Sequence, residues 1–472
     1  MTLRTPPGVT RREFLRMTAV ASSQLLAGGR SGAWERPETP AEVTIRIAPV
    51  RVEVAPDRMV STVGYNGSVP APVLRLREGR PVSVELVNET DMPELVHWHG
   101  QLVPSAIDGV AEEGSPSVPP HGRRRYTLTP TPAGTRWLHT HARAGVDLER
   151  GMYSGQFGFV YVEPRSEPGR FDREVFLASH EWLPFFSGDP MAGDGGEGLG
   201  LEGGLEIGYR VYSINGKALG HGDPVRVQRG ERVMFRILNA SATENIELAL
   251  PGHEFLVVAL DGNPVPAPHA VRLLSLGAAE RVDAVVEMNT PGVWILGTPN
   301  DAKRRSGLGI VVEYAGANGP PQWIAPAPAR WDYTLFGTRG PHAAPDETIP
   351  MVFQIMAAGH GHVDRWTING ATFEESAPIP VHRGRRYRLA LQNRGDDSHP
   401  LHLHRHQFEL VRVQESTGEW KPTAGVLKDT VLVRPNQRMD VDFVADNPGL
   451  TLFHCHHQLH MNFGFARLLR YR

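Results

Sequence analysis

The chain repeats one pattern three times, and this repeat limits the folds that it can adopt. Each copy has an Asn-Gly pair, then a glycine beside an arginine, then a short run of alternating apolar residues. The pairs are Asn66-Gly67, Asn215-Gly216 and Asn369-Gly370, and the runs begin at Val82, Val233 and Tyr387. An Asn-Gly pair favours a tight turn, and alternation with a period of two favours a strand. The repeat therefore predicts three similar β units in succession.

Composition supports an all-β fold of several domains. The 472 residues include 50 glycines and 40 prolines, which favour many short strands joined by turns. A chain of this length exceeds one ordinary core. Turn-forming residues cluster at 163–169 and 316–329, which predicts domains at 34–165, 166–318 and 319–472. The near balance of 49 basic and 52 acidic residues gives no electrostatic argument for binding nucleic acid or an anionic membrane surface.

The first 33 residues are expected to form an export signal. Arg11-Arg12 precedes a mildly apolar run at 17–26, and Ser31-Gly32-Ala33 offers a cleavage site. The pattern resembles a twin-arginine signal, whose pathway exports folded proteins. The apolar run is too short and too polar to span a bilayer, and no other segment qualifies. We therefore expect a periplasmic or otherwise exported protein with no membrane span in its mature chain.

The single cysteine lies in a histidine-rich stretch, His454-Cys455-His456, with His460 five positions after Cys455. If the segment 452–460 is a strand, Cys455 faces one side, and His454 and His456 face the other. A thiolate with two imidazoles favours copper over hard cations. One strand could then serve two metal sites, with Cys455 and His460 in one of them and the second nitrogen ligand coming from elsewhere.

Four histidine pairs have i, i+2 spacing, and all lie in the first and third predicted units. They are His97/His99, His139/His141, His402/His404 and His454/His456. On a strand, the members of such a pair lie on one face, roughly 6.5–7 Å apart, which suits two neighbouring ions better than one. Zinc sites close with about four ligands and do not require eight imidazoles beside a separate thiolate. The pairs therefore predict a cluster of several metals between the first and third units.

These residues resemble the four copper-binding motifs of three-domain multicopper oxidases, the laccase-like group. The matching motifs are His97-Trp98-His99-Gly100, His139-Thr140-His141, His399-Pro400-Leu401-His402-Leu403-His404, and His454-Cys455-His456 with His460. The resemblance extends from about Thr44 to the C-terminus. It implies three cupredoxin-like Greek-key β-sandwich domains, of which the second holds no copper and acts as a spacer. It also implies four copper ions, one of type 1, one of type 2 and a type 3 pair.

Carried over position by position, the resemblance implies eleven ligands. They are His399, Cys455 and His460 for type 1; His97 and His402 for type 2; and His99, His139, His141, His404, His454 and His456 for type 3. Cys455 would also pass electrons toward the type 3 pair. Asp108 matches the acidic residue that the family places near the type 2 copper, which implies proton delivery or water positioning. The structural alternative for Asp108 is an Asp-Gly turn with Gly109.

Three positions depart from relatives in this group. Phe465 stands where many bacterial relatives have an axial Met, so we expect a non-coordinating residue there and a raised potential. Met461 replaces a Glu that several relatives have in a proton path, so oxygen reduction should depend more on Asp108. His360-Gly361-His362 occupies the place of the methionine-rich insert of cuprous-oxidising relatives, and we expect an exposed loop.

The resemblance implies a laccase-like oxidase that takes single electrons from phenols or aromatic amines and reduces dioxygen to water. We expect it to act as a monomer. One alternative is a periplasmic oxidase of cuprous ion in copper tolerance, against which the missing methionine-rich segment argues. Another is a copper-free structural protein of the cell envelope, although all eleven ligand positions are filled. Two-domain nitrite reductases lack the full type 3 histidine set.

Overall fold

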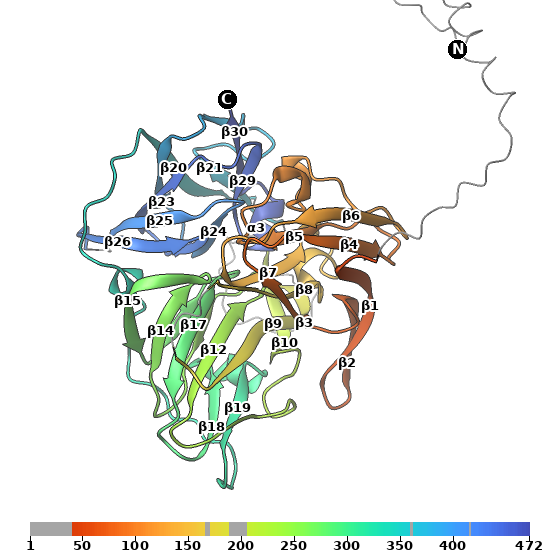
Figure 1. Ribbon diagram of the computed structural model, residues 1–472, viewed down its shortest axis with the longest axis vertical. Coiled ribbons are helices and arrows are strands. Elements are labelled where there is room, and N and C mark those ends of the chain that lie inside the picture. Colours follow the sequence, from red (N-terminus) through yellow and green to blue (C-terminus); the bar gives the residue numbers. More distant parts are fainter. Residues whose placement is uncertain (1–39, 166–169, 188–204, 359–361, 415–416) are drawn as a thin grey trace, which may run out of the picture. The chain divides into compact units, whose positions relative to one another are not determined.

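Three groups of strands follow one another along the chain in the computed structural model (Figure 1). The structure describes residues 40–165, 170–187, 205–358, 362–414 and 417–472, so the expected export signal lies outside the described residues. Strands dominate every group, which confirms the predicted all-β class. The residue boundaries of the predicted domains stay predictions, because residues 42–472 form one compact unit. Among the described residues, no helix is long and apolar enough to cross a membrane.

The first group has two four-stranded sheets. Their orders are β2-β1-β4-β6 and β3-β8-β7-β5. The strands are β1 (Val43–Ala55), β2 (Arg58–Tyr65), β3 (Ala71–Arg77), β4 (Val82–Asn88), β5 (Val96–His99), β6 (Arg123–Leu128), β7 (Gly134–Thr140) and β8 (Phe157–Glu163). Short 3-10 helices η1 (Ser105–Ile107), η2 (Ala111–Glu113) and η3 (Gly151–Tyr153) lie in the loops. Alternate residues of β4 are buried, as expected of a strand with one face on a core.

The second group is built on the six-stranded sheet β10-β9-β12-β17-β14-β15, with smaller sheets β11-β19-β18 and β13-β16. Its first strands are β9 (Arg173–Ser187), β10 (Glu206–Ile214), β11 (Val225–Val227), β12 (Arg232–Asn239), β13 (Ile246–Leu248) and β14 (Phe255–Leu260). They are followed by β15 (Asn263–Val271), β16 (Leu274–Leu276), β17 (Arg281–Glu287), β18 (Val293–Gly297), the helix α2 (Asp301–Arg305) and β19 (Gly309–Tyr314).

The third group has the sheets β21-β20-β23-β28-β25-β26 and β22-β30-β29-β24-β27. It begins with η4 (Tyr333–Phe336), β20 (Glu347–Met356), β21 (Arg365–Ile368), β22 (Ile379–Val381), β23 (Arg386–Asn393), β24 (His399–Leu403) and β25 (Phe408–Gln414). It ends with β26 (Trp420–Lys428), β27 (Thr430–Val433), β28 (Arg438–Val444), β29 (Leu450–Cys455), the helix α3 (Gln458–Asn462) and β30 (Ala466–Tyr471).

The three Asn-Gly pairs form equivalent turns, as the repeat predicts. The φ angles of the three asparagines are 52°, 53° and 56°, and those of the glycines are 78°, 74° and 77°. Two consecutive positive φ angles fit a type I′ turn. Each asparagine side chain also accepts a hydrogen bond from a backbone amide in the first strand of its group: Arg46 in β1, Ala178 in β9 and Val352 in β20. The repeat therefore ties each turn to the strand that opens its group.

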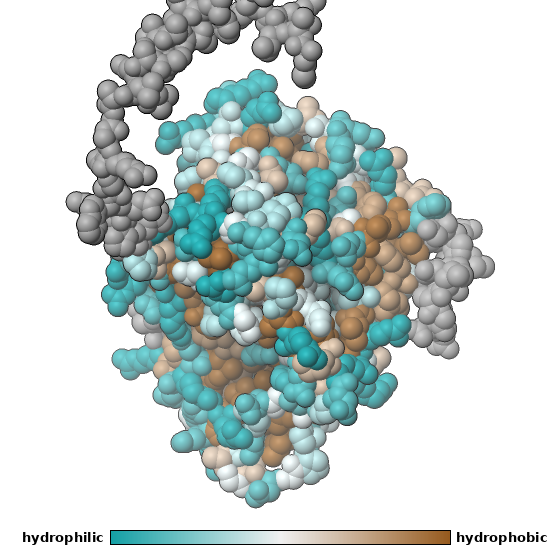
Figure 2. Space-filling view, turned by 90° about the vertical axis from the view of Figure 1, so that its right-hand side faces the viewer, coloured by the Kyte–Doolittle hydropathy of each residue, from teal (hydrophilic) through white to brown (hydrophobic). Residues whose placement is uncertain are grey.

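The molecular surface shown in Figure 2 is largely hydrophilic, with apolar residues emerging in several patches. Large apolar side chains that are exposed among the described residues include Met59, Met92 and Val146, which are 46%, 47% and 63% exposed. Scattered apolar residues of this kind are normal on soluble domains. The chemistry expected from the sequence lies among buried residues instead.

Candidate metal centres

Strand pairing brings the histidine pairs together. In the first group, His97 on β5 lies directly opposite His139 on β7. In the third group, His402 on β24 lies directly opposite His454 on β29. Because side chains alternate along a strand, the second histidine of each pair extends the same side. Each of these two sheets therefore presents four histidines, of which His141, His404 and His456 lie directly after the ends of their strands.

The two sets of four meet in one buried cluster, which we call the histidine cluster. Its members are His97, His99, His139, His141, His402, His404, His454 and His456, and they are 0 to 5% exposed. The His99 and His402 rings stack with centroids 3.7 Å apart, and the His97 and His404 rings are 4.1 Å apart. Both contacts join the first strand group to the third. The structure thus brings together all eight histidines that the sequence singled out.

The donor atoms of the histidine cluster suit metal binding. Ring nitrogens lie within 4.8 Å of one another in the sets His97/His99/His139, His97/His402/His404 and His141/His404/His454. Among the described residues, Nε2 of His97, Nε2 of His402 and both ring nitrogens of His141 and His456 have no hydrogen-bond partner. A buried polar atom is normally paired. Several unpaired nitrogens in one buried cluster therefore fit a set of metal ligands.

Backbone carbonyls orient four of these rings. In each of the four rings, Nδ1 donates a hydrogen bond of 2.8 to 2.9 Å to a backbone carbonyl. The pairs are His97 with Asp108, His402 with Asp429, His139 with Thr140, and His454 with Cys455. This contact leaves Nε2 of each ring for a metal. Burial also lowers the pKa of most rings in the cluster, for example to about 3 in His454. Such imidazoles are neutral at physiological pH, and the neutral form is the one that binds metals.

The second centre, which we call the cysteine site, consists of His399, Cys455 and His460. Cys455 Sγ lies 3.9 Å from His399 Nδ1 and 3.6 Å from His460 Nδ1, and all three residues are at most 3% exposed. Burial raises the pKa of the Cys455 thiol, so this thiol needs a bound cation to become a thiolate at neutral pH. A sulfur with two imidazoles is a donor set suited to copper.

The strand predicted for residues 452–460 ends earlier than expected. β29 stops at Cys455, and the helix α3 begins at Gln458. The expected alternation of side chains is present at positions 454 and 455, because His454 points into the histidine cluster and Cys455 into the cysteine site. A continuous strand would place His460 roughly 16 Å beyond Cys455, whereas the turn of α3 returns its ring to the thiol.

Phe465 occupies the position beside the cysteine site that the sequence analysis assigned to an axial residue. Its buried ring lies 4.8 Å from the His399 ring and 6.3 Å from the His460 ring. A phenyl ring offers no donor atom to a metal. Trp366 stacks on the other side of His460 at 4.1 Å. Apolar rings therefore hold His460 in place without adding a ligand.

Asp108 reaches two histidines of the cluster. Its Oδ2 accepts a hydrogen bond from His404 Nδ1 at 2.9 Å and lies 3.3 Å from His97 Nδ1. The Asp-Gly alternative also describes the backbone, because Gly109 has a φ of 83° and a Cβ there would lie 1.8 Å from the Val96 carbonyl oxygen. The turn thus aims the buried Asp108 carboxylate at the cluster.

Glu113 is a second carboxyl beside the cluster that sequence reasoning missed. Its side chain is 2.8 Å from Arg405 Nε and accepts a hydrogen bond from the Leu452 amide at 2.6 Å. Burial, followed by the charge of Asp108, raises the pKa of Glu113 well above its usual range. The adjacent Glu112 pairs with Arg143 nearer the surface. No spacing signal separates these two glutamates in the sequence.

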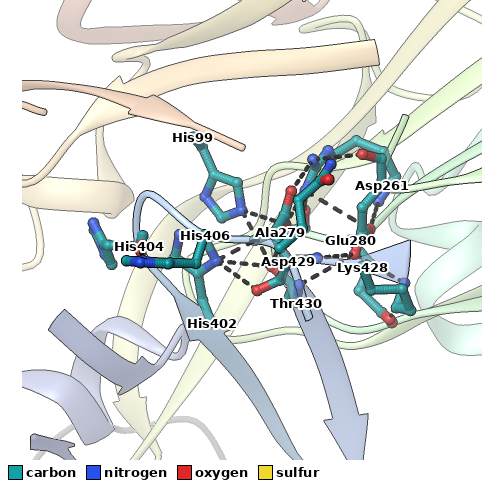
Figure 3. Close-up of polar contacts among 12 residues, drawn as sticks. His99, Asp261, Ala279, Glu280, His402, His404, His406, Lys428, Asp429 and Thr430 are labelled. Atoms are coloured by element: carbon teal, nitrogen blue, oxygen red, sulfur yellow. Dashed lines mark hydrogen bonds and ion pairs between the residues drawn. The ribbon is translucent and has the colours of Figure 1, made fainter. Parts of the chain in front are cut away.

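Asp429 is a third carboxyl that sequence reasoning missed, and it joins all three strand groups (Figure 3). Its Oδ1 lies 3.0 Å from His99 Nε2 in the first group. Arg281 of the second group donates to both carboxylate oxygens, at 2.7 and 2.6 Å. Burial alone would raise the pKa of Asp429, but the Arg281 guanidinium holds it below its usual range. No histidine spacing points to Asp429, because its partners are remote in sequence.

The remaining sequence candidates divide between core and surface. Met461 helps to line a cavity of about 10 Å³ at the edge of the histidine cluster, together with Met152 and Gln458. His362 is exposed, as expected, whereas His360 lies outside the described residues. The structure therefore places a thioether, and no carboxyl from position 461, at this edge of the cluster.

Comparisons with known proteins agree with this geometry. Three family models, each described as multicopper oxidase, match residues 47–167, 202–313 and 345–472. Multicopper oxidase MmcO of Mycobacterium tuberculosis is 29% identical over 486 residues, which cover 96% of this chain and 92% of that relative. The copper resistance protein A homolog of Pseudomonas syringae is 22% identical over 603 residues, which cover 98% and 99%. A crystal structure of a multi-copper oxidase from Pseudomonas thermotolerans is 25% identical, with a TM-score of 0.68 and coverage of 92% and 100%.

The family models match most of the chain, and each of the three strand groups contains one of the matched segments. Together with the structural likeness, they show cupredoxin-like domains and an oxidoreductase that depends on copper. Enzymes of this kind use a small-molecule reductant and dioxygen. The chain, with its buried histidine cluster and cysteine site, belongs to the multicopper oxidase family.

Proposed function

We propose that the protein is a laccase-like oxidase that takes single electrons from phenols or aromatic amines and reduces dioxygen to water. The observation that carries this proposal is the position of β29 between the two centres. His454 and His456 belong to the histidine cluster, and Cys455 between them belongs to the cysteine site. His454 and His456 are covalently linked to Cys455 through the backbone, and they thus give electrons a short path from the cysteine site to the histidine cluster.

The proposed holoprotein binds four copper ions through the eleven residues named from the sequence. The cysteine site is the type 1 site; His97 and His402 hold type 2, and the other six histidines of the cluster hold the type 3 pair. When bound, copper supplies one-electron transfer at the thiolate and the reduction of dioxygen at the cluster. The donor sets and unpaired nitrogens described above support this assignment.

Carboxyl groups near the cysteine site suit a phenolic or amine donor, which loses a proton as well as an electron. Asp397 lies two residues before His399. Burial, then Asp397 and Asp364, raises the pKa of Glu206 to about 7. A carboxyl with such a pKa can accept a proton from the donor near neutral pH. We assign Glu206 and Asp397 this role on the substrate side.

Asp108 and Glu113 serve the opposite, oxygen-reducing side. Asp108 contacts two histidines of the cluster, and Glu113 lies beside it with a pKa raised first by burial. A Glu113 carboxyl whose raised pKa keeps it protonated can hold a proton close to the cluster. We assign Asp108 proton delivery or water positioning, with Glu113 as its neighbour in the same hydrogen-bonded network.

Oxidation of cuprous ion is the second candidate function. The carboxyl of Glu206 interacts with those of Asp364 and Asp397, and Asp397 also interacts with the Cys455 thiol, so these carboxyls would attract cations toward the cysteine site. The Pseudomonas syringae relative is named for copper resistance. However, cuprous ion prefers thioether ligands to carboxylates. Met351 is fully buried and Met356 is 50% exposed on β20, so these two methionines form no exposed thioether pair for the ion.

We further propose that residues 1–33 direct export to the periplasm and that the exported protein is a monomer. The domain division at 34–165, 166–318 and 319–472 belongs to the same proposal. It is supported by the order of the strand groups and by the three matched segments.

Copper loading tests the proposal. The purified protein is loaded with copper, and its visible absorption and electron spin resonance spectra are recorded while oxygen uptake is followed with a phenol or with cuprous ion. We expect a strong thiolate-to-copper band, a type 2 signal and oxygen uptake with the phenol. Cys455→Ser should lose the visible band and keep the type 2 signal. Absence of the band in the fully loaded protein would overturn the assignment of Cys455, and uptake with cuprous ion alone would favour the second candidate.

A further inference from the structure

Arg281, the first residue of β17, connects the second strand group to the histidine cluster. Its side chain is fully buried, and Nη1 and Nη2 donate to Oδ1 and Oδ2 of Asp429. Two parallel hydrogen bonds between a guanidinium and a carboxylate fix the plane of the carboxylate as well as its position. Arg281 therefore determines how Asp429 faces its other neighbours.

Those neighbours are the two stacked rings of His99 and His402. His99 Nε2 lies 3.0 Å from Asp429 Oδ1, which leaves His99 Nδ1, 3.4 Å from His139 Nε2, facing the cluster. His402 Nδ1 donates to the Asp429 backbone carbonyl at 2.8 Å, which leaves its unpaired Nε2 facing the cluster. One residue thus selects the metal-binding nitrogen of two rings from different strand groups.

The second strand group also holds the backbone around Asp429. Asp261 Oδ2 accepts hydrogen bonds from the amides of Asp429 and Thr430, at 3.2 and 3.1 Å. Lys428 Nζ lies 2.9 Å from Asp261 and 3.0 Å from Glu280 (Figure 3). Residues of the second strand group therefore hold both the backbone and the side chains of the segment 428–430.

Gly100, which follows His99, makes room for this contact. A Cβ at position 100 would lie 2.7 Å from Arg281 Nη2 and 2.7 Å from Asp429 Oδ2. Gly100 also has a φ of 81°, which favours glycine. The ion pair is thus packed directly against the backbone that carries a cluster histidine.

We propose that Arg281 is a positioning residue for the metal cluster. It fixes Asp429, whose carboxylate contacts His99 directly and lies 3.8 Å from Nδ1 of His402, the ring that the Asp429 backbone carbonyl orients, and so sets the orientation and donor strength of both rings. A carboxylate that accepts a hydrogen bond from a metal-bound imidazole fixes its tautomer and strengthens it as a ligand. This inference rests on the proposed copper cluster but is independent of the reducing substrate. It gives the second group a role beyond that of the spacer expected from the sequence.

The test compares Asp429→Asn, Arg281→Lys and the double variant with the unchanged protein. Asn keeps the size and loses the charge, and Lys keeps the charge and loses the two-pronged contact. Asp283→Asn is the matched control, because Asp283 is also buried and pairs with an arginine, Arg236, at 2.7 Å, while its described partners include no histidine. Each protein is loaded with copper, and we measure the type 2 spin resonance signal, the copper content of the cluster and the visible thiolate band.

Asp429→Asn should alter the type 2 signal and weaken copper binding at the cluster by roughly tenfold to a hundredfold, with an unchanged visible band. Arg281→Lys should shift the same signal in the same direction by less. The double variant should match Asp429→Asn, because Arg281 acts through that carboxylate. Asp283→Asn should lower stability and leave the type 2 signal unchanged.

Additive effects of the two substitutions, or a type 2 signal in Asp429→Asn that matches the Asp283→Asn control, would overturn the inference. If Asp429→Asn does not fold, Arg281→Lys decides alone, since an unchanged type 2 signal contradicts the proposed role. These failures differ from failure of the proposed function, which would remove the visible band or the cluster copper from the unchanged protein.

Discussion

Phe465 is the single residue that most directly sets the expected electron affinity of the cysteine site. Its phenyl ring fills the space beside His399 and supplies no donor. A methionine there would add a thioether that stabilises the oxidised metal, so Phe465→Met should lower the reduction potential. A redox titration of the visible band measures this potential. Phe353→Met is the matched control, since Phe353 is buried 5.3 Å from the Phe465 ring in the same core, and it should leave the potential unchanged.

Asp108 is the residue to which we assign proton delivery at the histidine cluster. Asp108→Asn keeps the shape of the side chain and removes its acid, so reoxidation of the reduced enzyme by dioxygen should slow by roughly 10²- to 10⁴-fold. Stopped-flow mixing with dioxygen measures this step, and copper analysis checks that the cluster is still filled. Asp91→Asn, at an exposed carboxyl paired with His121, should have no effect. An unchanged reoxidation rate in a fully loaded Asp108→Asn variant contradicts the assignment.

At the scale of residues, the sequence can indicate which side chains come together where their arrangement depends on spacing along one strand. The i, i+2 pairs and the Cys455 alternation need only the period of a strand, and the structure places at least one histidine of each pair on a strand, with His141, His404 and His456 directly after the strand ends. Glu113 and Asp429 could not be found in this way. Asp429 meets His99 and Arg281 across 330 and 148 positions of the chain, and only tertiary packing creates those contacts.

At the scale of elements, β9 contains a buried acid that should make the fold sensitive to alkaline pH. Burial, then Glu244, raises the pKa of Glu181 to about 8. Between the pKa of an exposed glutamate and about 8, the folded state holds a proton that the unfolded state has lost. The free energy of unfolding should therefore fall as pH rises through this range.

Glu181→Gln should remove that dependence and raise the free energy of unfolding above pH 8 by about 5 kcal/mol, at about 1.4 kcal/mol per pKa unit. Urea unfolding at acidic and alkaline pH measures the difference. Glu247→Gln on the exposed face of β13 serves as the control and should change neither value. An equal gain for Glu181→Gln at both pH values contradicts the prediction.

The elements themselves were only partly predictable. The Asn-Gly turns follow from local chemistry, because asparagine and glycine tolerate positive φ and the asparagine side chain bonds to a nearby strand. The helix α3 was missed because it has five residues and no strong start signal, and its N-cap residue His457 makes no capping hydrogen bond. Such a short helix is held by its contacts with β29 and β21 and not by its own sequence.

At the scale of the whole molecule, the metal-free protein should lose stability in mild acid. Burial lowers the pKa of His399 and His454 to about 3, and it lowers that of seven other cluster and cysteine-site histidines as well. Below about pH 6.5 the unfolded chain binds protons that the folded chain does not. The free energy of unfolding should therefore fall as pH drops, by about 1.4 kcal/mol per pH unit for each such histidine.

Urea unfolding of the metal-free protein between pH 7.5 and pH 5 tests this expectation, and copper loading at pH 7.5 should raise the transition midpoint by mass action. His121→Gln, which replaces an exposed histidine paired with Asp91, should follow the same curve as the unchanged protein. A flat profile between pH 7.5 and pH 5 is incompatible with neutral buried histidines.

Gly100 lies at a position of the buried interior where substitution by another amino acid is not tolerated. Its Cα packs against the ion pair of Arg281 and Asp429, which joins the second and third strand groups. There is no room for a Cβ between this ion pair and the backbone that follows His99. Any other amino acid at position 100 would disturb the histidine cluster and the attachment between groups at the same time. In a saturation library selected separately for abundance and for activity, position 100 should therefore fail both screens with nearly every substitution. Gly340, where a Cβ would make only ordinary contacts at 3.7 and 3.9 Å and φ is not positive, should tolerate several.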